Sequence, residues 1–146
     1  MNVIHFVSVR HCTARLGLLF SVALFPIACG SDKARVYPVR GEVFVNGKPA
    51  PGALVHLHPR DKQNGRPAFA TVQQDGSFQL TTYATNDGAV PGEYAVTVNW
   101  YDERKDEGET IYSADKLRGR FTNVEKSGLS ATVNVGGNDL PRFDLK

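Results

Sequence analysis

Residues 75–100 carry the clearest alternation of apolar and polar side chains in the chain. A repeat of two places neighbouring residues on opposite faces of an extended strand, so each strand here is predicted to have one buried face. Phe78 and Leu80 share that face in the first half of the stretch. In the second half it is predicted at four positions: Tyr94, Val96, Val98 and Trp100. Because aromatic side chains bury the most area, we expect this second strand in the middle of the core, with Ala95 and Thr97 on its opposite face.

Short alternating segments of the same kind recur along the rest of the chain. Besides the two strands above, strands are predicted at residues 38–45, 53–58, 67–73, 129–135 and 140–145, with a short edge strand at 117–124. Residues 101–116 are hydrophilic and lack a periodic apolar stripe, so they are predicted to form a mobile loop. Asn46-Gly47 and Asp75-Gly76 favour tight hairpin turns.

About seven short strands and no helix predict an all-β fold, a single seven-stranded antiparallel β-sandwich. The core of this sandwich is predicted at ten positions: Val43, Val55, Leu57, Phe78, Leu80, Tyr94, Val96, Val98, Val133 and Val135.

The first 29 residues have the pattern of an export signal. Arg10 and Arg15 give a positive start, and residues 16–27 form an apolar run. That run is too short for a membrane span, which needs ~20 residues, and it has signal-peptide length. We therefore expect a cleaved signal peptide at 1–29, a polar tether at 30–36 and one domain at 37–146.

Cys29 follows a small residue directly after the apolar run. Ile27, Ala28 and Cys29 resemble the bacterial lipobox, in which the cysteine becomes the lipidated first residue, although Pro26 stands where the pattern usually has Leu. The resemblance implies lipid attachment at Cys29 and anchoring to a bacterial membrane, at the outer membrane or cell surface. The alternative is an ordinary leader cut near Ala28 and a secreted protein.

The balance of charge excludes one class of partner. The chain has 17 basic and 15 acidic residues, and loss of Arg10 and Arg15 with the leader leaves 15 of each. A formally neutral domain has no basic surplus to neutralise phosphates, so nucleic acid is not an expected partner. Cys12 would be lost with the leader, so the exported domain would retain only Cys29 and no internal disulfide.

Three segments carry a family resemblance. They are VRGEVFVNGKPAPGALVHLHP from Val39, ATVQQDGSFQLTTY from Ala70, and PGEYAVTVNW from Pro91. Together they resemble the carboxypeptidase-regulatory-like domains, related in fold to transthyretin-like, prealbumin-type sandwiches. The resemblance covers most of residues 38–146, and the end of the chain is similar to that of small bacterial lipoproteins. It implies a non-enzymatic binding or structural module of the cell envelope, with no cofactor and with envelope proteins or polysaccharide as candidate partners.

One alternative function is metal binding. His56 and His58 occupy the same face of a predicted strand, a spacing that lets two imidazoles hold zinc or copper. A third ligand would be needed, and Asp61 is the nearest candidate in the sequence. The simpler interpretation is a pair of solvent-facing histidines. Asn86-Asp87-Gly88 and the acidic residues 102–109 could suggest calcium, but neither follows the spacing of an EF-hand loop.

A second alternative is carbohydrate binding. Tyr83, Tyr101 and Tyr112 lie in or near predicted loops, where an aromatic ring can stack on a sugar or anchor a protein partner. Catalysis is not expected: the prealbumin-type hydrolase of 5-hydroxyisourate carries a C-terminal Tyr-Arg-Gly-Ser, and this sequence has Phe-Asp-Leu-Lys at 143–146.

Overall fold

The computed structural model describes residues 33–63 and 65–146, which form strands, turns and loops without a helix. The predicted signal peptide and Cys29 lie outside the described residues, as does the start of the predicted tether. The strands are β1 (Val39–Val45), β2 (Lys48–Pro49), β3 (Leu54–Pro59), β4 (Ala68–Thr71), β5 (Ser77–Gln79), β6 (Gly92–Asn99), β7 (Glu103–Asp106), β8 (Glu109–Tyr112), β9 (Leu129–Val133), β10 (Asn138–Asp139) and β11 (Phe143–Leu145). No helix among the described residues has the length and hydropathy of a membrane span.

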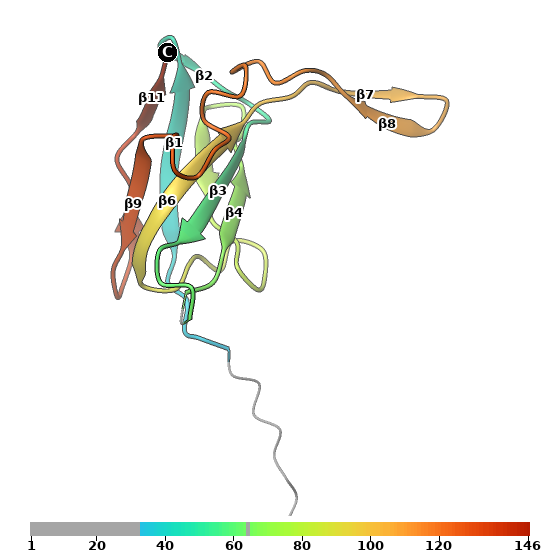
Figure 1. Ribbon diagram of the computed structural model, residues 1–146. Coiled ribbons are helices and arrows are strands. Elements are labelled where there is room, and N and C mark those ends of the chain that lie inside the picture. The colour runs from blue at the N-terminus through green and yellow to red at the C-terminus, as the bar shows by residue number, and fades with distance from the viewer. Residues whose placement is uncertain (1–32, 64) are drawn as a thin grey trace, which may run out of the picture. The chain divides into compact units, whose positions relative to one another are not determined.

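Two sheets make up the body of the domain, in a sandwich-like arrangement (Figure 1). In one sheet β1 is central, with β2 and β5 on one side and β10 and β11 on the other. The other sheet has the order β4-β3-β6-β9 and is antiparallel throughout. The prediction of an all-β fold is therefore confirmed.

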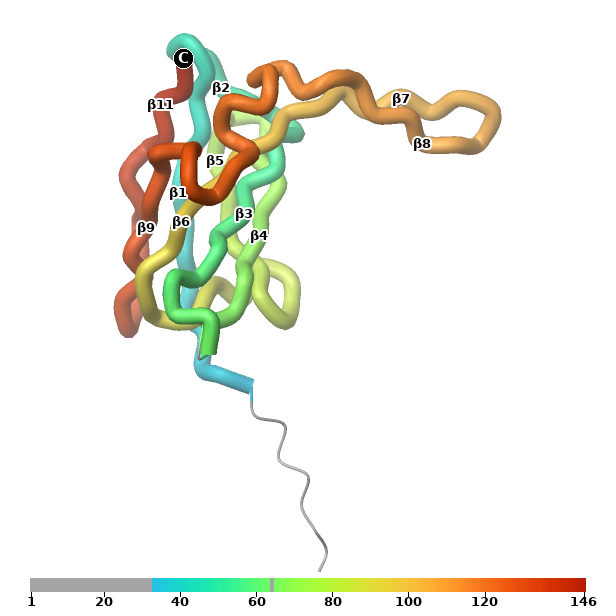
Figure 2. Tube along the Cα trace, viewed as in Figure 1, coloured from blue at the N-terminus to red at the C-terminus, as the bar shows by residue number. Residues whose placement is uncertain are grey.

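The detailed strand prediction needs two corrections. The described residues contain more and shorter strands than the seven expected, because β1 has two different neighbours along each of its edges. The sheets are also not purely antiparallel, since β10 and β11 both run parallel to β1. Figure 2 shows the end of the chain returning beside β1. An alternating pattern shows which face of a strand is buried, but it does not show which strand pairs with it. The parallel pairing could therefore not be predicted from the sequence.

The core contains nine of the ten predicted residues, contributed by both sheets. Val135 is the exception, because 74% of its side chain is exposed. The alternation stops at the end of β9, where Asn138 closes a turn: its Oδ1 accepts from Asn134 N, and its Nδ2 donates to the carbonyls of Asn134 and Gly136. Val135 therefore lies in a turn and not on a strand face.

β6 is buried on both faces over its central residues. Ala95 and Thr97, predicted on the face opposite the core, are buried as well. Trp100, predicted to share the buried face, follows the last residue of β6 and is only partly buried against the core. The prediction of a mid-core strand is confirmed, whereas the prediction of a single buried face is wrong for this strand.

Residues 101–116 differ from the predicted mobile loop. They contain the antiparallel hairpin β7–β8, which extends away from the two sheets (Figure 1). Every residue of both strands is exposed, so no apolar stripe was present in the sequence to reveal them. The edge strand predicted at 117–124 is also absent: this segment is mainly turns, with one strand-like hydrogen bond from Val98 N to Phe121 O of 3.0 Å.

Candidate functional site

Two of the three predicted binding tyrosines meet where the β7–β8 hairpin leaves the body of the domain. Tyr101 immediately precedes the hairpin and Tyr112 is the last residue of β8. Their rings make an edge-to-face contact with centroids 6.4 Å apart. Asn99 Nδ2 donates a 3.0 Å hydrogen bond to Tyr101 Oη and so orients that ring. Tyr112 keeps 62% of its side chain exposed.

The two rings form one wall of a recess of about 360 Å³. The loop before β3 and the adjoining strands supply the rest of the lining: Pro51, Gly52, Leu54, Thr71, Asp102 and Glu103. The recess thus combines the apolar residues Pro51 and Leu54 with the acidic residues at the base of the hairpin. An aromatic wall combined with a few polar groups is a common composition for a small-ligand site.

The base of the hairpin is fixed by hydrogen bonds. Asp102 N donates to Ser113 Oγ at 2.8 Å, and Ser113 N donates to Asp102 O at 2.9 Å. One step nearer the body, Lys116 N donates to Trp100 O, and the Lys116 ammonium lies 4.5 Å from the centroid of the Trp100 ring. Trp100 Nε1 also donates to Pro51 O at 3.0 Å. These bonds hold both sides of the recess in one arrangement.

Tyr83, the third predicted tyrosine, does not join this recess. It lies in the loop before β6, whereas Tyr101 follows the end of β6. A strand of this length separates its two ends by about 25 Å. The rings of Tyr83 and Tyr101 therefore belong to opposite ends of the domain.

His56 and His58 lie side by side on the outer face of β3, as the alternation predicted. Their ring centroids are 6.3 Å apart and the rings are inclined by 20°. His58 Nε2 is 2.9 Å from the hydroxyl of Thr97 on β6. Thr97 itself is 97% buried. Burial, and then the neighbouring His56 imidazole, lower the pKa of His58 below its usual value, so its neutral form is favoured at neutral pH. Both histidines are partly exposed on this half-buried strand.

Asp61 is not brought into a ligand set with the histidines. Within residues 33–63 and 65–146, no three His, Cys, Asp or Glu side chains are grouped as a metal site would require. Asp61 lies in the loop after β3, where its carboxylate accepts a hydrogen bond from Gln63 N. Any metal held by the pair would take its remaining ligands from water or another molecule.

The two acidic segments considered for calcium have structural roles in the described part of the chain. The Asp87 carboxylate accepts hydrogen bonds from the backbone amides of Thr82, Tyr83 and Ala84 at 2.7–3.0 Å. Burial raises the pKa of this carboxyl, but the backbone donors outweigh that effect and lower the pKa overall. Residues 102–109 form most of the exposed hairpin. Asp87 thus stabilises a loop through its hydrogen bonds, and the acidic residues 102–109 belong to a hairpin.

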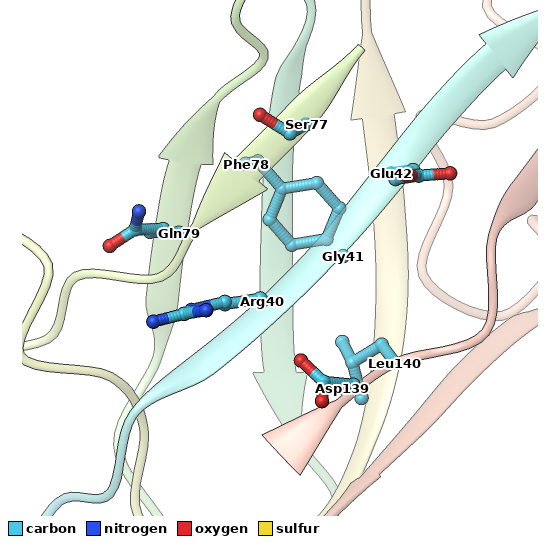
Figure 3. A pocket seen from close by; sticks show the side chains of 8 residues that line it. All are labelled: Arg40, Gly41, Glu42, Ser77, Phe78, Gln79, Asp139 and Leu140. Carbon is cyan, nitrogen blue, oxygen red and sulfur yellow. The ribbon is translucent and has the colours of Figure 1, made fainter. Parts of the chain in front are cut away.

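A second depression lies on the other sheet. It measures about 560 Å³ and is lined by Arg40, Gly41, Glu42, Ser77, Phe78, Gln79, Asp139 and Leu140 (Figure 3). Its aromatic residue, Phe78, is fully buried, so no aromatic surface is offered to a ligand. The lining also has no histidine or cysteine for metal chemistry. This depression is therefore a weaker candidate than the recess beside Tyr112.

Sequence reasoning missed the residues that support the candidate sites. Thr97 and Leu54 belong to the apolar and polar alternation of their strands, which gives no sign that they flank a site. Pro51 stands in a turn and Asn99 at a strand end. Their roles depend on contacts between β3, β6 and the hairpin, and only the folded arrangement reveals them.

Comparisons with known proteins identify no family. A scan against protein-family models found no match, and a search of curated proteins found no match either. Among solved structures, a 9R-lipoxygenase from Cyanothece PCC8801 is similar at 12% identity and a TM-score of 0.43, covering 80% of this chain and 18% of the lipoxygenase.

Two smaller proteins are similar at the same level. A DUF3823 family protein from Parabacteroides merdae has 16% identity and a TM-score of 0.37, covering 75% of this chain and 46% of that protein. A proposed carbohydrate-binding protein from Pseudomonas aeruginosa has 14% identity and a TM-score of 0.38, covering 77% of this chain and 88% of that protein. The class of protein is therefore defined by the fold itself: an all-β, sandwich-like domain with a tyrosine-walled recess at one end.

Proposed function

We propose that this protein is a non-enzymatic binding module of the bacterial cell envelope, and that the recess beside Tyr101 and Tyr112 binds a saccharide of an envelope polysaccharide. We further propose that the domain is of the carboxypeptidase-regulatory-like, transthyretin-like type. In this proposal the domain has the seven-stranded, prealbumin-like architecture, with some of the seven strands divided into shorter ones. Cys29 carries the lipid anchor. The three sequence segments that resemble this family fall on β1 to β3, on β4 and β5, and on β6.

The observation that carries the saccharide proposal is the exposure of Tyr112. A large aromatic ring with 62% of its side chain in water stabilises the fold little. This ring is nevertheless placed by the hairpin and by an edge contact with the oriented ring of Tyr101. A preorganised exposed ring of this kind is suited to binding, because little conformational freedom is lost when a ligand stacks on it.

The other lining groups complement a sugar. Saccharides have apolar C–H faces that pack on aromatic rings, and hydroxyls that donate hydrogen bonds to carboxylates. Glu103 and Thr71 line the same recess, together with Asp102, whose carboxylate forms an ion pair with the Lys116 ammonium. Because Glu103 adds a negative charge to the recess, a neutral or amino sugar fits better there than a uronic acid, whose carboxylate would be repelled.

The test is binding of the full chain to an array of bacterial-envelope oligosaccharides, with wild type compared to Tyr112→Ala. Loss of a central aromatic contact costs about 2 kcal/mol, so affinity for the retained saccharides should fall at least about tenfold. Tyr101→Phe keeps the ring and should bind more tightly than Tyr112→Ala. Tyr83→Ala, at the opposite end of the domain, is the matched control and should bind like wild type.

Two results would contradict the proposal. If no saccharide on the array binds the wild-type protein, the ligand class is wrong. If saccharides bind but Tyr112→Ala retains them while Tyr83→Ala loses them, binding takes place at the other end of the domain.

A further inference from the structure

The histidine pair on β3 has features that the saccharide site does not use. His56 and His58 occupy alternate positions on a central strand of the β4-β3-β6-β9 sheet, so both imidazoles emerge from the same rigid surface. Neighbouring residues on this face are small or apolar: Ala95 is opposite His58 in the register with β6, and Phe69 is opposite His56 in the register with β4. No lysine or arginine stands at these paired positions to compete with a cation.

The buried hydroxyl of Thr97 orients one of the two rings. In the tautomer in which His58 Nε2–H donates to Thr97 Oγ1, the lone pair of His58 Nδ1 is free to bind a ligand. A metal-binding histidine is commonly held in this way, with its second ring nitrogen hydrogen-bonded to an oxygen atom. His56 is partly exposed and makes a ring contact with His58, with no side-chain hydrogen bond within the described residues.

From this arrangement we propose that His56 and His58 form a two-imidazole site for a divalent transition-metal ion, Cu²⁺ or Zn²⁺, with Thr97 positioning His58. Two nitrogens that each lie about 2 Å from one ion are about 3–4 Å apart. The ring centroids are 6.3 Å apart, so with His58 held by Thr97 the His56 ring must rotate about its side-chain bonds to bring a nitrogen within this distance of His58 Nδ1. The remaining coordination positions are taken by water and are open to a donor from another molecule.

Imidazole ligands distinguish this site from one for a hard cation. Neutral imidazole binds copper, nickel and zinc, whereas magnesium and calcium prefer oxygen ligands. The pair should therefore bind Cu²⁺ more tightly than Zn²⁺, and should not bind Mg²⁺. Copper held by two imidazole nitrogens gives nitrogen hyperfine splitting in its electron paramagnetic resonance spectrum, and this signature identifies the ligands directly.

The experiment is titration of the full chain, without a histidine tag, with Cu²⁺ and with Zn²⁺, followed by calorimetry and electron paramagnetic resonance. His56→Ala/His58→Ala should abolish one equivalent of binding and the two-nitrogen splitting. Every variant retains His5, His11, Cys12 and Cys29, so the difference from wild type isolates the pair. Tyr112→Ala should bind metal like wild type, which separates this site from the saccharide recess.

Thr97→Val tests the positioning role without removing a ligand. Valine has a similar shape and suits a buried strand, so the fold should be kept, as circular dichroism would verify. Loss of an outer partner weakens metal affinity by about 10- to 100-fold, so a fall of about tenfold is expected with the nitrogen splitting still present at saturation. Absence of binding by wild type, or equal binding by wild type and the double variant, would overturn the proposal.

Discussion

At the scale of single residues, Gly41 and Phe78 make a close approach in the core. These residues are paired across β1 and β5, and the Phe78 ring lies beside Gly41 (Figure 3). A Cβ added at Gly41 would come within 2.4 Å of Phe78 Cζ. The same ring stacks on Phe143 of β11 at a centroid distance of 6.3 Å. Gly41 therefore provides the space in which one aromatic ring links three strands.

Gly41→Ala is expected to destabilise the domain. The added methyl group overlaps a fully buried ring, and overpacking of this kind costs about 1–3 kcal/mol. The free energy of unfolding from urea denaturation measures the effect. Gly137→Ala is the matched control, because its added methyl group would meet no atom within 4 Å. An equal free energy of unfolding for the two variants would show that the Phe78 ring can shift without destabilising the domain.

The residue scale also shows what the sequence could reveal of the core and the sites. Val96, Val98 and other residues inside regular strands were predicted correctly, since alternation follows directly from strand geometry. Val135 was not, because a side chain–backbone turn at Asn138 ends the strand two residues early. The meeting of Tyr101 with Tyr112 was not predictable either, as it depends on a hairpin that buries nothing.

At the scale of elements, the β7–β8 hairpin contributes to the proposed binding site but little to the stability of the fold. Its strands are wholly exposed, and their only apolar side chains are Ile111 and Tyr112. A two-stranded hairpin is marginally stable by itself in water. This one is held at its base by the paired residues Asp102 and Ser113. The hairpin thus presents Tyr112 while adding little to the core.

Replacing residues 103–112 with Asn-Gly is expected to leave stability nearly unchanged and to abolish saccharide binding. Asp102 and Ser113 already face each other as the ends of a turn would, and exposed residues contribute little to folding. The free energy of unfolding should change by less than about 1 kcal/mol. Urea denaturation and the oligosaccharide array measure the two effects separately. A loss of several kcal/mol would mean that the hairpin is part of the folded core, and retained binding would remove Tyr112 from the site.

At the scale of the whole molecule, the two ends of the described chain are joined through one strand. β1 begins the fold, and β10 and β11 end it on the same edge of β1. Strands that pair in parallel need a long crossover connection, and in this chain that connection includes the four strands of the second sheet. The sequence predicted a strand at 140–145 from its apolar pattern, but the neighbour of that strand is a property of the complete topology.

Cys29→Ala is expected to release the domain from the membrane. If Cys29 is the lipidated first residue, its acyl chains provide the anchoring that a single chain cannot sustain. Wild-type protein expressed in a bacterium with lipoprotein processing should then be recovered with membranes, and mass spectrometry should find a lipidated N-terminal Cys29. Cys12→Ala is the matched control, because Cys12 lies within the predicted leader and its loss should leave membrane recovery unchanged. An unmodified N-terminus at another residue, or equal membrane recovery of Cys29→Ala and wild type, would reject the anchor. Neither result would alter the expected saccharide and metal binding, which depend on residues of the folded domain.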